Sequence, residues 1–271
     1  MISVRWVIAV AAFCPAIALA GCSGSDTGQS PKGNATTTAS AAPASPAPAP
    51  TDAAGLAALL HQGIASVNSL HLILDVSTGG QVIKGEGDTK LAGGTLQALD
   101  ISEVVGSAGN VRLIVVDGKT YVQLPATLNQ SGKPWVLVSR DSTNPTVRTM
   151  ATLIESVQNA ASPGQITAFT SAARRVTLVG NESLDGIQVN HYSIDVDVAK
   201  LPNTMPGRQM LLGAGLTSLP VELYVDGEGR PVKITQDLML NGQRSSTVIT
   251  LSKFNEPVSI SAPPADQVAT S

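Results

Sequence analysis

The sequence predicts an α+β fold in which a curved antiparallel sheet carries a few helices on its concave side. Apolar residues from Leu70 to Leu251 recur mostly with a period of two, as in strands that bury one face. Asp-Gly and Asn-Gly dipeptides separate neighbouring strands, as in tight hairpins. Helical spacing appears in only a few stretches, without the strand-helix alternation of parallel α/β proteins. So few helices cannot cover a wide sheet on both sides, which favours a sheet curved around them.

The composition excludes several functional classes. Of the 271 residues, 43% are hydrophobic, which excludes disorder throughout the chain. The 17 Lys and Arg residues against 20 Asp and Glu give a net charge of −3 without a basic run, so nucleic acid is not expected as a partner. Both cysteines, Cys14 and Cys22, lie near the N-terminus. The remaining chain therefore lacks an internal disulfide, a thiol nucleophile or a zinc-thiolate site.

The first residues are typical of a bacterial lipoprotein signal peptide. Arg5 precedes an apolar stretch from Trp6 to Leu19, which is shorter than the roughly 20 apolar residues that a bilayer-spanning helix needs. Leu19-Ala20-Gly21-Cys22 resembles a lipobox, whose cysteine takes a diacylglycerol before cleavage makes it the first residue. We expect residues 1–21 to be removed and Cys22 to hold acyl chains such as palmitate in the membrane. The alternative is an ordinary secretory signal with a cysteine by chance.

Residues 22–52 are expected to be the lipidated cysteine and a tether. From Ser23 to Asp52, 25 of the 30 residues are Ala, Ser, Thr, Pro or Gly, and none is a large apolar residue. Such a segment cannot bury enough surface to offset its chain entropy, and its Pro-rich part should be extended. The sequence thus predicts one folded domain at residues 53–263, followed by a flexible tail at 264–271.

The folded domain is expected to open with an amphipathic helix at residues 53–67. Leu56, Leu60 and Ile64 recur at helical spacing, and Asp52 is suited to cap the N-terminus. A second helix is expected at 146–160, where apolar residues share one face. Its apolar face consists of Val147, Met150, Leu153, Ile154 and Val157.

Strands are expected from Leu70 to Val138 and again after residue 174. Leu72, Leu74 and Val76 would share one face of the first strand, and Asp117-Gly118 would turn a later hairpin between 111–116 and 120–124. The later strands are expected at 175–180, 187–198, 221–225, 232–240 and 247–251. Asp226-Gly227 and Asn241-Gly242 are further turn signals. The total is about nine or ten strands.

The sequence lacks the common catalytic motifs. It contains no Gly-x-Ser-x-Gly, Ser-x-x-Lys or His-Glu-x-x-His pattern, so no catalytic residue is predicted. His61, His71 and His191 are expected at the surface or its boundary rather than as metal ligands, and no metal or cofactor is predicted. An acid pair on the sheet, such as Glu222 with Asp237, stays open as the enzymatic alternative.

The apolar strand faces are the candidate binding site. The core is mostly aliphatic, so both a close-packed interior and a cavity are compatible with it. The segment from Met205 to Leu219 mixes flexible apolar side chains with Gly207, Gly213 and Gly215, which suits either an adaptable lid or a short buried helix. The residues expected to line a cavity are Leu72, Leu74, Val76, Val111, Leu113, Val115, Met210, Leu211, Leu212, Leu216, Val221, Leu223, Val225 and Ile234.

The whole layout resembles a known group of lipoproteins. The lipobox, the tether and the opening helix are followed by Ile114-Val-Val-Asp-Gly-Lys-Thr-Tyr-Val122, Pro134-Trp135 and Leu219-Pro-Val-Glu-Leu-Tyr-Val-Asp-Gly227. Together they resemble the mycobacterial LppX/LprA/LprF/LprG lipoproteins, and more broadly LolA/LolB-like lipid carriers. The chain departs from the pattern at Tyr224, where relatives often have Trp.

This resemblance implies a half-open antiparallel barrel, closed by helices around an apolar cavity. The cavity would bind acyl chains of lipids or glycolipids and carry them across the cell envelope without catalysis. The protein would be anchored at the outer face of the cell membrane through Cys22, with a membrane transporter as a further partner. The alternative is a structural or signalling envelope lipoprotein with a solid core, which binds a protein through its sheet edge.

Overall fold

The computed structural model describes residues 48–93, 95–105, 109–125, 132–139, 141, 169–203, 205, 208–240 and 242–269. The predicted signal peptide, Cys22, the tether up to residue 47 and the predicted helix at 146–160 lie outside these residues. The apolar segment at 205–219 is described except for residues 206 and 207.

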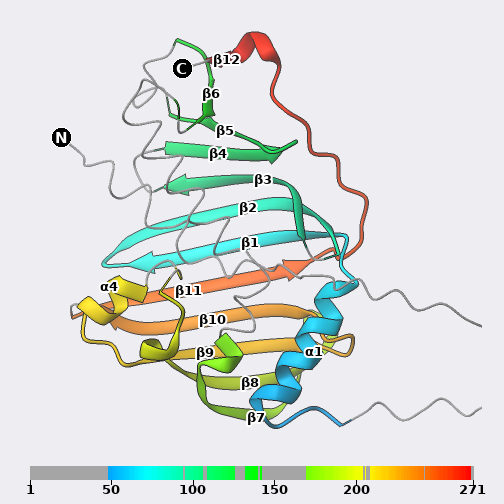
Figure 1. The fold of residues 1–271 in the computed structure, drawn as a ribbon, viewed down its shortest axis with the longest axis vertical. Helices are drawn as coiled ribbons and strands as arrows, with labels where there is room; N and C mark the ends of the chain where they lie inside the picture. The colour runs from blue at the N-terminus through cyan, green and yellow to red at the C-terminus, as the bar shows by residue number, and fades with distance from the viewer. Residues whose placement is uncertain are drawn as a thin grey trace, which may run out of the picture.

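The described chain is organised by one sheet, which curls around the first helix (Figure 1). Its strands are β1 (Ser69–Thr78), β2 (Gln81–Ala92), β3 (Thr95–Val105), β4 (Gly109–Val116), β5 (Lys119–Gln123), β6 (Trp135–Val138), β7 (Ala173–Leu184), β8 (Ile187–Asp197), β9 (Ser218–Asp226), β10 (Pro231–Leu240), β11 (Gln243–Ser252) and β12 (Val268–Ala269). The spatial order is β12-β6-β5-β4-β3-β2-β1-β11-β10-β9-β8-β7. All pairs are antiparallel except β12 with β6. This confirms the predicted α+β class and the curved sheet.

The first helix, α1, spans Ala53–Ala65 and lies across the β7–β10 part of the sheet (Figure 1). The side chain of Asp52 accepts a hydrogen bond from the backbone N–H of Gly55 at 2.9 Å, so the predicted N-cap is confirmed. Leu56, Leu60 and Ile64 are buried, as their spacing of four residues requires for one helix face. The predicted helix ran two residues further, to Val67.

Two glycines fix where α1 meets the sheet. A Cβ atom on Gly63 would lie 2.2 Å from the backbone carbonyl of Gly229, in the turn between β9 and β10. Gly229 has a φ of +81°, and a Cβ there would lie 2.5 Å from the carbonyl oxygen of Leu59. Backbone therefore packs directly on backbone at this point, which only glycine allows.

The predicted hairpin at Asp117-Gly118 joins β4 to β5. Both residues have positive φ angles, of 52° and 70°, as the type I′ turn requires. Asp185 and Gly186 form a turn of the same kind between β7 and β8, with φ angles of 50° and 83°. At Asp226-Gly227 the loop is wider, because the Asp226 side chain accepts hydrogen bonds from the backbone N–H groups of Glu228 and Arg230.

The sheet buries apolar residues on both of its faces. We call the face toward α1 the inner face and the opposite one the outer face. Beneath α1 the inner face forms a core with the helix, and residues around β1 and β11 extend it. At β4–β6 the outer face forms another core, whose members are Ala98, Ile114, Val116, Tyr121, Trp135 and Val268, with Leu137 and Ile260 against it.

The C-terminal part of this outer core corrects the predicted domain boundary. The sequence places the end of the domain at residue 263, yet Val268 is 7% exposed and Val268–Ala269 pairs with β6 as strand β12. A short 3-10 helix, η3 (Ala265–Gln267), leads into that strand. A strand is predicted from the alternation of apolar and polar residues, and two residues are too few to show it. The sequence therefore does not predict β12.

Candidate functional site

The inner face has a continuous apolar row that crosses several strands. Direct cross-strand partners place Leu74 of β1, Ile249 of β11, Ile234 of β10 and Leu223 of β9 side by side. Tyr192 of β8 and Leu178 of β7 continue the row. Since opposite residues of an antiparallel pair share a face, this row is a single apolar wall.

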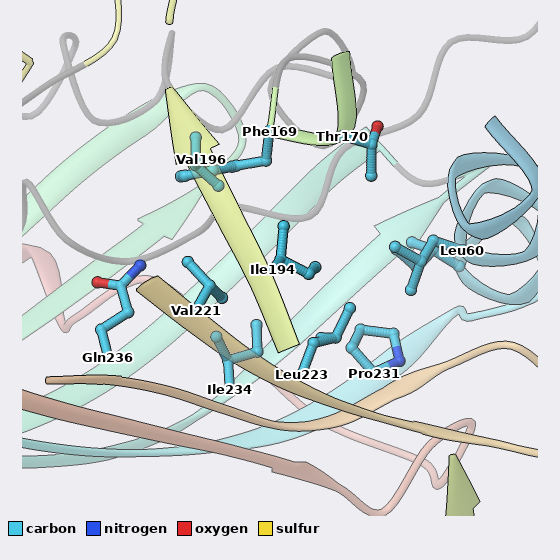
Figure 2. Close-up of a pocket in the computed structure, with 11 residues that line it drawn as sticks. Leu60, Phe169, Thr170, Ile194, Val196, Val221, Leu223, Pro231, Ile234 and Gln236 are labelled. Atoms are coloured by element: carbon cyan, nitrogen blue, oxygen red, sulfur yellow. The ribbon is translucent and has the colours of Figure 1, made fainter. Parts of the chain in front are cut away.

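A pocket opens between this wall and helix α1 (Figure 2). It is lined by Leu60, Ile64, Phe169, Thr170, Ile194, Val196, Val221, Leu223, Pro231, Ile234 and Gln236. Nine of these eleven residues are apolar. In Figure 2, Leu60 of α1 and Pro231 stand at one end of the row of side chains and Gln236 at the other.

The size of the pocket limits what it holds. The space inside the pocket amounts to about 600 Å³, a figure that includes open solvent. About 70 Å³ of it can hold the centre of a water molecule. One water needs roughly 10–15 Å³ by that measure, so the space takes a short stretch of alkyl chain. A longer chain requires the pocket to widen.

Three of the residues expected to line a cavity, Val221, Leu223 and Ile234, do line this pocket. Val225 and Leu211 are buried in the core beneath α1, with Leu212 and Leu216 packed against it. Leu74 belongs to the neighbouring core around β1, with Leu72 and Val76 packed against it. On β4, Val115 is buried, whereas Val111 and Leu113 are half-buried. The cavity role of all residues outside the pocket stays a prediction.

The segment expected to be a lid contains a short helix, α4 (Arg208–Gly213). Met210 is 47% exposed, whereas Leu211 is buried, so α4 turns Leu211 and not Met210 toward the core. Gly215, with a φ of +77°, ends the helix: its N–H donates to Leu212 O, and that of Leu216 donates to Leu211 O. This is a Schellman cap, so a glycine at position 215 is required by the helix end and is not by itself evidence of flexibility.

Two buried polar groups on the inner face lack a hydrogen-bond partner in the described protein. Gln236 lines the pocket at 8% exposure, and its Oε1 has no hydrogen-bond partner in the described protein. The hydroxyl of Tyr192 is also buried without a partner there, and burial raises the pKa of Tyr192. Glu103 of β3 lies on the inner face opposite Gly85, and burial raises the pKa of its carboxyl group.

The outer face has a polar cluster on β7–β10 that the sequence pattern did not reveal. The two ring nitrogens of His191 lie 2.6 Å from Glu182 Oε1 and 2.8 Å from Glu222 Oε2, and the ring stacks on Tyr224. Ser193 Oγ donates to Glu222 Oε1 at 2.8 Å, so the serine hydroxyl faces the carboxylate and not the imidazole. Burial and the two glutamates raise the pKa of Tyr224.

The proposed acid pair of Glu222 and Asp237 is engaged elsewhere. Glu222 accepts from His191 and Ser193, whereas both carboxylate oxygens of Asp237 accept from Arg244 at 3.0 Å. Arg244 thereby lowers the pKa of Asp237. Within the described residues, His, Cys, Asp and Glu side chains nowhere gather in threes with the geometry to hold a metal ion. The described helices also include none with the length and apolarity to cross a membrane.

Eight of the eleven pocket residues were not among those that the sequence predicted to line a cavity. Ile194 and Val196 fall in a strand that was predicted without an assigned face, and Pro231, Phe169 and Thr170 lie outside the predicted elements. Gln236 had a readable signal: it stands between Ile234 and Leu238 at two-residue spacing, as a polar residue in an apolar series.

A solved lipoprotein structure shares the fold. The crystal structure of the Mycobacterium tuberculosis lipoprotein LppX matches with a TM-score of 0.50 and 17% identity, over 77% of this chain and 99% of that one. LprF from Mycobacterium bovis gives a TM-score of 0.48 at 15% identity, over 79% and 99%. The Pseudomonas aeruginosa MucA/MucB complex gives 0.35 at 14%, over 78% and 59%. No protein-family model matches the chain, and no curated protein matches its sequence.

The resemblance to the LppX group that the sequence indicated is thus confirmed at the level of the fold. LppX and this chain share the same half-barrel arrangement over nearly the full length of LppX.

Proposed function

We propose that this protein is a lipid-binding lipoprotein of the cell envelope, which takes acyl chains of lipids or glycolipids into the pocket beneath α1. The observation that carries the proposal is the pocket itself, an apolar hollow between the helix and the inner face of a half-barrel sheet. An interior that only stabilised the fold would be closely packed, since empty apolar space costs stability. The LppX-like fold and the lipobox at Cys22 support the same function.

The mechanism requires no catalytic step. An acyl chain that leaves water for the pocket wall gains about 25 cal/mol for each Å² of apolar surface buried. The polar head of the lipid would remain at the mouth, where water solvates it. Because the space present is small, loading would widen the gap between α1 and the sheet, and the acylated N-terminus would keep the carrier at the membrane.

Lipid retention tests the proposal. The full chain with Cys22→Ala, which removes the acylation site, is purified without detergent, extracted with organic solvent and analysed by mass spectrometry. We expect acyl lipids in near-stoichiometric amount. In Leu223→Trp the indole would occupy the pocket, so lipid should be lost with a stability change below about 1 kcal/mol. The matched control is Thr235→Trp on the outer face of β10, which should keep its lipid.

A different result would refute the carrier. If the Cys22→Ala protein holds no lipid, and Leu223→Trp costs the 1–3 kcal/mol typical of an overpacked core, the interior is solid. The anchor has its own test, because the unsubstituted protein should partition into a detergent phase and the Cys22→Ala variant should not.

The sheet edges give little support to the alternative of a protein-binding adaptor. At one edge β7 has register shifts between Ala173 and Arg175 and between Leu178 and Gly180, and such bulges hinder pairing with a further strand. The other edge is β12, which has only two residues. We therefore do not propose strand addition as a second function.

A further inference from the structure

Gln236 is an unusual residue to find in an apolar pocket. It follows Ile234 on the inner face of β10 and stands directly opposite Thr247 of β11. Only 8% of its surface is exposed, and its Oε1 has no hydrogen-bond partner in the described protein. Burying an amide without a partner costs roughly 1–3 kcal/mol by mutational estimates, so a residue serving stability alone would be Leu or Val here.

The surroundings of Gln236 leave its carboxamide facing the pocket. Its lining neighbours Val221, Ile194 and Val196 are apolar and have no side-chain hydrogen-bonding group. Thr247, the direct cross-strand neighbour, has a hydroxyl group, but Gln236 Oε1 accepts no hydrogen bond from it in the described protein. Further along the same face, Thr78 Oγ1 and Ser245 Oγ lie 2.7 Å apart and pair with each other. Figure 2 shows the carboxamide at one end of the pocket, on the same side of β10 as Ile234.

The spacing of Pro231 and Gln236 along β10 shows how far the carboxamide lies from the other end of the pocket. Pro231 and Gln236 both line the pocket and are separated by five residues of β10, or about 16 Å at the usual rise per residue. A chain that enters beside Pro231 and Leu60 would therefore meet mainly apolar side chains before it reaches Gln236, with Thr170 as the other polar residue of the lining. The carboxamide offers one acceptor and two donors there, which a hydroxyl group satisfies with both its hydrogen and its lone pairs.

From this geometry we infer that the pocket selects acyl chains that have a hydroxyl group within their apolar part, with Gln236 as the specificity-determining residue. The inference rests on the proposed lipid-binding function and names its ligand class. A plain alkyl chain would leave the amide unsatisfied when it displaces water from the pocket, whereas a hydroxylated chain would donate to Oε1.

The test compares plain octadecanoic acid with its monohydroxylated isomers, with the hydroxyl near the carboxyl end, in mid-chain or near the tail. Each acid competes with a fluorescent fatty acid for the full chain with Cys22→Ala. We expect one isomer to bind about tenfold more tightly than the plain acid, as one hydrogen bond to a buried group warrants. In Gln236→Leu this preference should disappear, while the plain acid binds as well as before or better.

Two further measurements separate recognition from a structural role. Tyr192→Phe also removes a buried hydroxyl without a partner, yet Tyr192 does not line the pocket, so the preference should survive in that variant. The unfolding midpoint of empty Gln236→Leu should equal or exceed that of the parent, because an unsatisfied amide is lost.

Distinct outcomes overturn distinct claims. If plain and hydroxylated acids bind the parent equally, or if the preference survives in Gln236→Leu, the inference is wrong and the lipid-binding function stands. If Gln236→Leu lowers the unfolding midpoint, the amide serves the fold and is not reserved for a ligand. If no acid displaces the fluorescent probe, or if the probe does not bind, the proposed function fails and the inference fails with it.

Discussion

The part of the sheet beneath α1 and the part at β4–β6 bury their residues in different ways. On β9 burial alternates, so that Val221, Leu223 and Val225 are buried while Glu222 and Tyr224 are only partly covered on the outer face. On β4 the consecutive residues Ile114, Val115 and Val116 are all buried. The outer face of β4–β6 is covered by the chain's own C-terminal segment, through Ile260 and Val268.

This difference accounts for the pocket beneath α1. At β7–β10 the inner face is covered by a helix whose contact with the sheet is fixed at one point, Gly63 on Gly229, and space remains beside it. At β4–β6 strand β12 extends the sheet at its edge and is hydrogen-bonded to β6, and its Val268 side chain packs into the outer core together with Ile260. A helix over a sheet can separate from it without breaking a ladder of hydrogen bonds, whereas a paired strand cannot. Stability and binding should therefore respond separately to changes in the two regions.

The largest expected effect comes from Gly63→Ala. Its new Cβ would meet the Gly229 backbone at 2.2 Å, and backbone cannot rotate away as a flexible side chain would. We expect a loss of about 3 kcal/mol in the free energy of unfolding together with loss of bound lipid, because α1 must shift. Denaturant titration and lipid extraction measure the two effects. The control is Gly213→Ala, which adds its methyl group in open space and should cost nothing.

If Gly63→Ala keeps both its stability and its lipid, the backbone contact does not position α1. The Gly63–Gly229 contact would then not explain why the part of the sheet beneath α1 differs from the part at β4–β6.

The second largest effect is expected at the other region, from Val268→Ala. This change removes two methyl groups from the outer core and should cost about 2 kcal/mol. Lipid retention should be unchanged, since Val268 lies on the face opposite the pocket. The exposed neighbour Asp266 provides the control, because Asp266→Ala should alter stability by less than about 0.5 kcal/mol. A coupled loss of lipid in Val268→Ala would show that the two regions are not independent.

The sequence predicted the elements of both regions better than their packing. The helix followed from Leu56, Leu60 and Ile64 with a capping Asp52, and the β4–β5 hairpin from Asp117-Gly118, because these signals are local. Alternation also placed Val221 and Leu223 on one face correctly. These features depend on residues a few positions apart.

The remaining features depend on contacts between distant segments. Alternation predicted one apolar face on β4, made of Val111, Leu113 and Val115. Ile114 and Val116 on the other face are buried as well, because a segment some 150 residues later packs against them. The pocket depends on how far α1 stands from the sheet, which Gly63 and Gly229 decide together. The residues around Gly63 and around Gly229 contain no local pattern that predicts this contact.

A smaller effect is expected from Leu113→Trp, which tests whether the cavity continues along the inner face toward β4. Leu113 is half-buried and shares that face with Ile101 and Val122, its partners on β3 and β5. If acyl chains extend this far, the indole should lower lipid retention by less than Leu223→Trp does, with a stability change within about 1 kcal/mol. Full retention of lipid would confine binding to the pocket beneath α1.

The smallest effect is expected from Glu103→Gln, on the same inner face. Burial raises the pKa of the Glu103 carboxyl above its ordinary value of 4.5, so the folded protein binds this proton more tightly than the unfolded chain does. The free energy of unfolding should therefore fall as the pH rises from 4.5 through the raised pKa, and the cost should be complete above it. Glutamine cannot ionise, so Glu103→Gln should be more stable than the parent at neutral pH and equal to it below pH 4.5. Unfolding midpoints at both pH values measure this difference, with exposed Glu86→Gln on β2 as the control. An equal gain at both pH values would mean that the amide packs better than the acid, and that the inner face at β3 does not exclude water.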